Sequence, residues 1–202
     1  MVARGAHTAA RADAAHRRAH ERGRGTLNKA LFPGLRIGYA VVPRALRQAF
    51  IGARYLIDRQ PATLQQVVVS EFMQQGHFAA HIRRMRLLYR EQRDALAETL
   101  TRRAAGRLDV ALPDQGMHLV AYLRDRSSDI AIEAAARRAG IVVRAISRFY
   151  RAARPRPGLM LGFSGFPRQL IVPAAVRLAT LVASRGDKAF KDRASFRSGR
   201  AI

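Results

Sequence analysis

The second half of the chain alternates short apolar runs with amphipathic segments, and this order limits the possible folds more than any other feature. After Gly106 the spacing predicts two strands, a helix, two further strands and a last helix. Ser128 is placed to cap the first of these helices and Gly140 to end it. The order β-β-α-β-β-α predicts an α+β sandwich, with helices on one face of a short sheet. The expected strands cover 107–112, 117–123, 141–146 and 158–163, and the expected helices cover 129–139 and 168–184.

The first half of the chain predicts one strand followed by three helices. A proline ends the strand, Thr63 is a good N-cap for the second helix, and glycines end the second and third helices. The third helix should be the longest, because apolar residues recur on one of its faces from Phe78 to Leu100. The expected strand covers 35–42, and the expected helices cover 44–57, 63–75 and 78–105.

Both ends of the chain are poor in large apolar residues. Residues 1–24 hold one valine as their only large aliphatic residue besides the first methionine, so they can bury almost nothing. We therefore expect four parts. They are a disordered or non-native segment over 1–24, a first folded part over 25–105, an α+β domain over 106–184, and a charged tail over 185–202.

The chain is strongly basic, with a formal net charge of +23. Clustered positive charge is typical of nucleic-acid binding, because it neutralises phosphates. Almost all of this charge is arginine, however, since Lys29, Lys188 and Lys191 are the only lysines. The arginine comes with heavy alanine and glycine use, as GC-rich coding would produce. We therefore expect general attraction to polyanions, and a basic nucleic-acid-binding module stays open as an alternative.

The composition also excludes several classes of protein. The sequence has no cysteine, so it can form neither disulfides nor cysteine metal sites. No apolar run is long enough to suggest a membrane span, and the N-terminus lacks the apolar region of a secretory signal. We expect a cytoplasmic protein with no membrane partner.

The stretch "GTLNKALFPGLRIGYAVVP", residues 25–43, carries the chemistry that the sequence suggests. Lys29 lies in a loop just before an apolar strand, where burial would lower its pKa and make its amine a nucleophile able to form a Schiff base. Thr26 offers a hydroxyl, Gly25 lets backbone approach a ligand, and Arg36 supplies a planar fork suited to phosphate. The alternative is that Lys29 and Arg36 are ordinary loop charges.

The segment "GTLNKALFPGLRIGY" resembles the region around the cofactor lysine of fold-type I pyridoxal-phosphate proteins. It is most similar to the aminotransferase-like domain of MocR-type regulators of the GntR superfamily, whose pattern is roughly G-[ST]-F-S-K-x-L-x-P-x-L-R-x-G-Y. The resemblance continues through "GMHLVAYL", "GIVVRAISRFY" and "PGLMLGFSGF", and covers 25–184. It implies an α/β fold: the end of an aminotransferase large domain with the interdomain helix over 25–105, then the whole small α+β domain.

The resemblance implies roles for individual residues. Lys29 would form the Schiff base with pyridoxal 5'-phosphate, while Thr26 and Arg36 would contact the cofactor phosphate. Asn28 takes the place of the family's usual serine and would be a further phosphate contact. Tyr39 follows the arginine as in the family, for packing. The implied partners are a small amino-group ligand or effector and a second copy of the chain in a homodimer, with DNA bound only through an N-terminal winged-helix module.

Two features depart from the family pattern. The acidic partner of the cofactor ring normally lies upstream of the lysine, and here the only upstream acids, Asp13 and Glu21, match no motif. With the winged-helix module also absent, we expect a truncated effector domain of a MocR-type regulator. Aminotransferases carry an arginine for the substrate carboxylate where this sequence has Met160, which favours regulator ancestry over a transaminase. Arg144 and Arg156 are then the candidates for binding a substrate carboxylate.

The alternative function is a pyridoxal-phosphate-dependent aminotransferase of class I/II, or a fragment of one, so that enzymatic activity stays open. A metal site is not expected. His77 and His81 lie four residues apart on a helix, but no third ligand is evident. His118 lies in an expected strand, where a packed or edge histidine is the simpler interpretation.

Overall fold

The computed structural model of the protein describes residues 24–59, 61, 63–152 and 154–198. The segment expected over 1–24 therefore lies outside the described residues, except for Arg24. The chain divides between Arg84 and Met85 into two compact units, and the division falls within one long helix. We call them the N-terminal unit and the C-terminal unit and describe each by itself.

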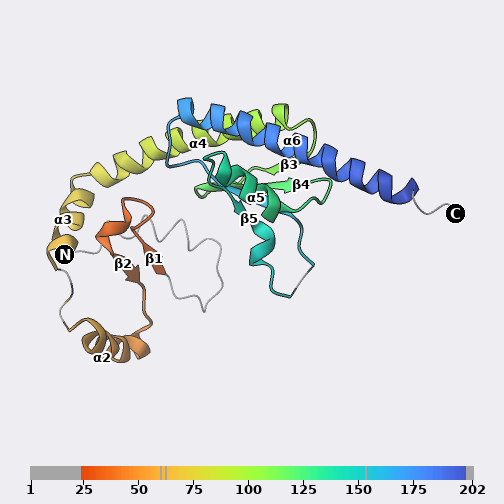
Figure 1. Cartoon of the computed structure of the whole chain (residues 1–202). Helices are drawn as coiled ribbons and strands as arrows, with labels where there is room; N and C mark the ends of the chain where they lie inside the picture. The colour runs from red at the N-terminus through yellow and green to blue at the C-terminus, as the bar shows by residue number, and fades with distance from the viewer. Residues whose placement is uncertain (1–23, 60, 62, 153, 199–202) are drawn as a thin grey trace. The chain divides into compact units, whose positions relative to one another are not determined.

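The N-terminal unit holds a two-stranded antiparallel sheet and helices. Strand β1 pairs with β2 (Figure 1), with Gly25 opposite Tyr39. A short 3₁₀ helix, η1, lies between the strands, and a second, η2, precedes α2. The elements are β1 (Arg24–Thr26), η1 (Pro33–Leu35), β2 (Gly38–Ala40), η2 (Arg44–Leu46), α2 (Arg47–Asp58), α3 (Thr63–Gln74) and the start of α4 (His77–Arg103).

The helices of the N-terminal unit lie where the apolar periodicity of the sequence predicts them, whereas the strand differs from the predicted one. The expected strand over 35–42 is reduced to Gly38–Ala40, because Pro33 and Gly34 begin a 3₁₀ turn that includes Leu35. The prediction that this strand is buried is wrong. In the described part of the chain β2 pairs with β1 alone, and all three of its residues are exposed.

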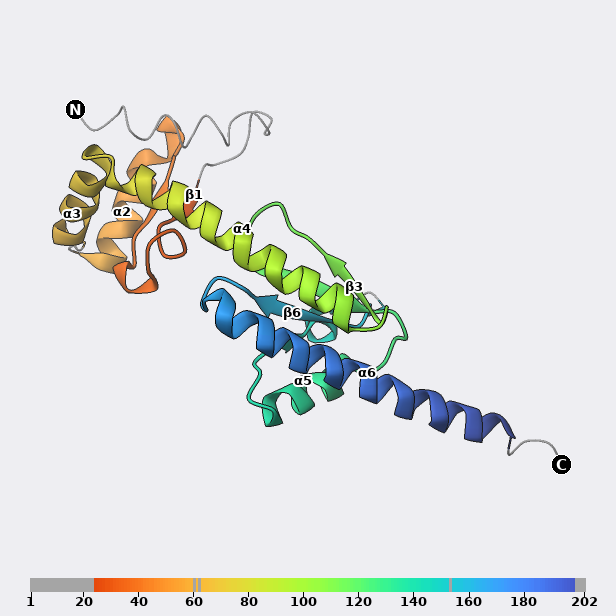
Figure 2. The same cartoon turned by 90° about the horizontal axis from the view of Figure 1, so that it is seen from above.

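The C-terminal unit is built on a four-stranded antiparallel sheet in the order β3-β4-β6-β5. The expected order β-β-α-β-β-α is confirmed. Helix α6 runs alongside the C-terminal half of α4 (Figures 1 and 2). The elements are β3 (Leu108–Ala111), β4 (His118–Leu123), α5 (Asp129–Arg138), β5 (Arg144–Ala145), the 3₁₀ helix η3 (Ile146–Phe149), β6 (Gly158–Gly162) and α6 (Arg168–Ser198).

One face of this sheet forms the core. Alternate residues of β4 and β6, such as Leu119 and Leu159, are fully buried with Leu100 of α4, Ile132 of α5 and Leu178 of α6. The expectation of helices on one face of a short sheet is therefore confirmed. The alternation arises because successive side chains of a strand point to opposite faces.

The buried carboxylate of Asp129 joins three elements of this unit. It lies in the first turn of α5, is 2% exposed, and accepts hydrogen bonds from the backbone N–H and hydroxyl of Ser147 and from Gly158 N. The preceding residue, Ser128, accepts from Ala131 N at 3.2 Å, which confirms the predicted helix cap. The start of α5 is thus fixed to η3 and to β6.

Two expectations for the C-terminal unit need correction. The strand expected over 141–146 is only Arg144–Ala145, because Ile146 begins η3. The last helix does not end at 184 and fray, but continues to Ser198. Residues 185–198 include no proline and consist largely of residues that tolerate a helix interior, so nothing local stops it.

Among the described helices, none combines the length and the apolar character needed to cross a membrane.

Candidate functional site

The hairpin of β1 and β2 closes a loop that carries Lys29. Thr26 lies opposite Gly38 in the antiparallel register, and Leu27 N donates to Ile37 O at 3.0 Å. Leu27 is also one of the buried residues of the N-terminal unit. Residues 28–36 are therefore held as a loop whose two ends meet at the sheet.

Thr26 lies at the neck of this loop. Its Oγ1 accepts a hydrogen bond from Asn28 N at 3.2 Å and donates to Ile37 O at 3.4 Å. The second distance is long for a hydroxyl donor, so the proton is weakly engaged and free to turn toward a better acceptor. Because Arg36 directly precedes Ile37, the geometry brings Thr26 and Arg36 to the same end of the loop.

Arg36 has a left-handed backbone, with φ of 52° and ψ of 30°. Its N–H donates to Pro33 O at 3.3 Å, which ends the 3₁₀ turn η1. A residue with a Cβ is disfavoured in this conformation by about 1–2 kcal/mol. Strained residues of this kind concentrate at binding sites, and the side chain of Arg36 is exposed.

The expected burial of Lys29 is wrong. Its side chain is exposed, because the strand that follows is itself exposed, and its amine contacts no carboxylate among the described residues. The lysine is instead positioned by its neighbours. Leu31 N donates to Leu27 O at 2.8 Å, so that the backbone turns once around Lys29.

Asn28 leaves a polar atom without a partner. Its Oδ1 is buried and accepts no hydrogen bond in the described structure. A buried polar group without a partner costs free energy, and a ligand with a donor would remove that cost. If the side-chain amide of Asn28 were flipped, its NH₂ group would take the place of Oδ1 and could donate to an anionic ligand.

The charge around this loop favours an anion. Residues 24–57 include six basic residues and no acidic residue. A hydroxyl, an amide, an ammonium and a guanidinium therefore lie in one loop without a neighbouring carboxylate in that stretch. This set of donors fits a phosphate-bearing ligand that also reacts with an amine.

Two contacts of the loop were missed by sequence reasoning. His81 Nε2 lies 3.0 Å from Ala30 O, next to Lys29, although 51 residues separate the two in the chain. The space that Gly25 leaves is taken by Tyr39 rather than by a ligand, since a Cβ on Gly25 would lie 2.5 Å from the Tyr39 ring. The Tyr39 ring thus lies over Gly25, although the residue is 54% exposed, and no local pattern identifies either partner.

The histidines form no metal site in the described part of the chain, where no group of three His, Cys, Asp or Glu side chains could hold a metal ion. His81 makes the contact with Ala30 O, and the ring of His77 lies 5.7 Å from that of Phe72.

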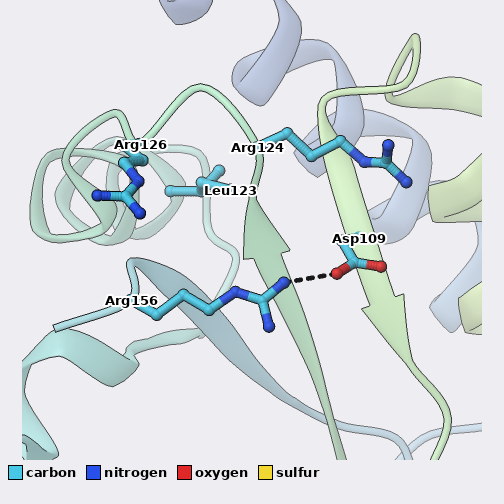
Figure 3. Close-up of a pocket in the computed structure, with 5 residues that line it drawn as sticks. All are labelled: Asp109, Leu123, Arg124, Arg126 and Arg156. Atoms are coloured by element: carbon cyan, nitrogen blue, oxygen red, sulfur yellow. Dashed lines mark hydrogen bonds and ion pairs between the residues drawn. The ribbon is translucent and has the colours of Figure 1, made fainter.

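The two carboxylate-binding candidates lie in the C-terminal unit and are not brought together. Arg144 lies on the edge strand β5 directly opposite Met160, so the two side chains share the sheet face that does not form the core. Arg156 donates to Asp109 Oδ2 at 2.6 Å, across β4 (Figure 3). Arg144 is exposed and Arg156 is engaged with a carboxylate.

Comparison with known proteins gives one family. The sequence profile of the family described as "Aminotransferase class I and II" matches residues 25–158. The chain is 36% identical over 141 residues to the "Probable rhizopine catabolism regulatory protein MocR" of Rhizobium meliloti, which covers 70% of this chain and 29% of that protein. It is 27% identical over 157 residues to the "Uncharacterized HTH-type transcriptional regulator YhdI" of Bacillus subtilis, covering 77% and 33%.

A solved structure shows the same fold. The α-aminoadipate aminotransferase LysN of Thermus thermophilus, complexed with N-(5'-phosphopyridoxyl)-L-leucine, matches with a TM-score of 0.71 and 24% identity, over 80% of this chain and 41% of that one. The chain thus spans about a third of the length of the two regulators and two-fifths of that aminotransferase.

Proposed function

The chain belongs to the class I and II aminotransferase family, and on that premise we propose that it binds pyridoxal 5'-phosphate covalently through Lys29. The observation that carries the proposal is the β1–β2 hairpin, which gathers Thr26, Lys29 and Arg36 into one closed loop. The phosphopyridoxyl ligand named for LysN supports the choice of cofactor.

Each residue of the loop has a part in the proposed site. Lys29 supplies the primary amine, and its exposure leaves that amine open to an incoming aldehyde. The guanidinium of Arg36 and the hydroxyl of Thr26 hold the phosphate, and the Asn28 amide adds a further contact. When bound, pyridoxal phosphate supplies an aldehyde carbon that an amine attacks and a ring that withdraws electrons from it.

We propose further that the domain senses a small amino-group ligand, as the effector-binding part of a MocR-type regulator. The similarity to two regulatory proteins supports this proposal. So does Met160, an apolar residue where the family's enzymes need an arginine. Arg144, which lies opposite Met160, is the proposed contact for a carboxylate on the ligand.

The test is a titration with pyridoxal phosphate. The quantity measured is the visible absorbance band that this aldehyde develops on reacting with an amine. We expect a saturable band with one equivalent per chain, lost in Lys29→Ala and kept in Lys188→Ala/Lys191→Ala. A band of equal strength in Lys29→Ala would refute the proposal.

A second measurement separates a sensor from an enzyme. The protein, loaded with pyridoxal phosphate, is mixed with an amino acid and a keto acid, and transfer of the amino group is followed. We expect the absorbance band to respond to the amino acid without turnover. Turnover that depends on Lys29 would make the aminotransferase the better description.

A further inference from the structure

A second anionic site is suggested by a pocket in the C-terminal unit. The pocket has a volume of about 480 Å³ and is formed where β3, the end of β4 and the segment before β6 meet (Figure 3). Its size falls in the usual range for small-ligand sites. Its lining is mostly charged, and consists of Asp109, Leu123, Arg124, Arg126 and Arg156.

The charges of this pocket are not balanced. Asp109 pairs with Arg156 at 2.6 Å and is the only carboxylate of the lining. In the described structure Arg124 and Arg126 have no carboxylate partner, since the neighbouring Asp125 pairs with Arg107. Figure 3 shows the Arg124 and Arg126 side chains extending to opposite sides of the end of β4, and a bound anion would supply the negative charge that this lining lacks.

Arg156 is already held in place for such an anion. Its guanidinium carbon lies 3.7 Å from the centre of the Tyr122 ring, and one of its nitrogens donates to Asp109. A guanidinium fixed from two sides loses little freedom when it binds a ligand with its remaining N–H groups. The pocket therefore has one preorganised guanidinium group, that of Arg156, and two without a carboxylate partner, those of Arg124 and Arg126.

The turn that presents Arg126 is strained. Arg126 has a φ of 54°, in the left-handed region, and its N–H donates to Leu123 O at 3.4 Å. Ser127 N donates to Asp125 Oδ1 at 3.0 Å and fixes the same turn. Glycine would adopt this backbone without strain, so the arginine side chain is not needed for the turn itself.

We propose that this pocket binds a small phosphorylated molecule, such as a phosphate ester or a diphosphate. Planar guanidinium groups match phosphate oxygens in pairs, and two unpaired arginines call for a ligand with at least two negative charges. Leu123 is the one apolar residue of the lining, so an aromatic or aliphatic ligand finds little to contact. A duplex nucleic acid fits a pocket of this size less well than a small anion.

The proposal does not depend on the function proposed for Lys29. The pocket lies wholly in the C-terminal unit, and none of its lining belongs to the β1–β2 hairpin. Lys29→Ala should therefore leave anion binding at the pocket unchanged. The two proposals can fail separately.

The experiment is calorimetric titration of the full chain with pyrophosphate at constant ionic strength. We expect saturable binding of one equivalent to the wild type and to Lys29→Ala, and affinity at least about tenfold lower in Arg124→Gln/Arg126→Gly. The control Arg83→Gln/Arg84→Gln removes the same formal charge from exposed positions of α4 and should change affinity by less than about twofold.

Arg126→Gly alone separates binding from folding. Because glycine suits the turn, its melting temperature should not fall, while its affinity for pyrophosphate should. The proposal is overturned if the wild type shows no saturable binding, if both double variants lose affinity equally, or if Arg126→Gly binds as the wild type does. Complete displacement of pyrophosphate by an equimolar short DNA duplex would also overturn it, in favour of a nucleic-acid surface.

Discussion

Lys29 is the one lysine of the hairpin loop in a chain whose other basic residues are nearly all arginine. Arginine stays protonated and cannot act as a nucleophile, whereas a lysine can lose its proton and attack an aldehyde. The two other lysines, Lys188 and Lys191, lie in helix α6. The chemistry proposed for the hairpin therefore rests on a single amine.

Arg36 allows binding and folding to be separated in this loop. Its left-handed backbone favours glycine, so Arg36→Gly should keep the free energy of unfolding or raise it by up to about 1 kcal/mol. The same change removes a phosphate contact and should lower the affinity for pyridoxal phosphate about tenfold or more. Denaturant unfolding and the absorbance titration measure the two effects. Unchanged affinity would show that Arg36 does not bind the phosphate.

At the scale of elements, the sequence predicts well where local signals act alone. Helix α5 begins after Ser128 because the serine hydroxyl satisfies a backbone N–H, and this follows from neighbours in the sequence. The three-residue strand β1 was missed, because nothing but its pairing with β2 makes it a strand. The shortening of β5 likewise depends on η3 and not on the apolar run that suggested a longer strand.

The same distinction applies to the candidate sites. Thr26, Lys29 and Arg36 could be grouped from the sequence because eleven consecutive positions contain them, and the family resemblance added Asn28 to the group. The contacts of His81 with Ala30 and of Arg156 with Asp109 join residues 51 and 47 positions apart. Such pairs are set by tertiary packing, so the pocket around Arg156 was not predictable.

Gly158 and Gly162, the first and last residues of β6, should differ in their tolerance of a side chain. A Cβ on Gly158 would lie 2.9 Å from Ile146 Cδ1 and 3.0 Å from Ala121 O, whereas on Gly162 its nearest neighbour would be 3.6 Å away. Gly158→Ala should therefore lower the free energy of unfolding by about 1–3 kcal/mol. Gly162→Ala, the matched control in the same strand, should change it by less. Equal losses in denaturant unfolding would contradict this packing.

At the scale of the whole molecule, burial is very uneven. The hydrophobic core cluster lies entirely in the C-terminal unit. In the described N-terminal unit, Leu27 and Val69 are the buried hydrophobic residues, while Leu56 and Ile57 of α2 are each 81% exposed. Local opening should therefore need much less free energy in the N-terminal unit.

Hydrogen exchange followed by mass spectrometry tests this difference. Amides of β4 and β6, whose alternate side chains are buried, should exchange orders of magnitude more slowly than those of α2, which buries none of its residues. Equal protection of α2 and β4 would mean that something covers the apolar side chains of α2.

The most direct test of the central claim is to locate the amine that reacts with pyridoxal phosphate. The protein is incubated with one equivalent of the cofactor, reduced with borohydride to make the bond permanent, digested and mapped by mass spectrometry. We predict that the phosphopyridoxyl group is found on Lys29, and that Lys29→Arg prevents labelling while Lys188→Arg/Lys191→Arg does not. Labelling spread over Lys188, Lys191 and the N-terminal amine, with Lys29 no more reactive than these, would contradict the assignment of the hairpin as the cofactor site.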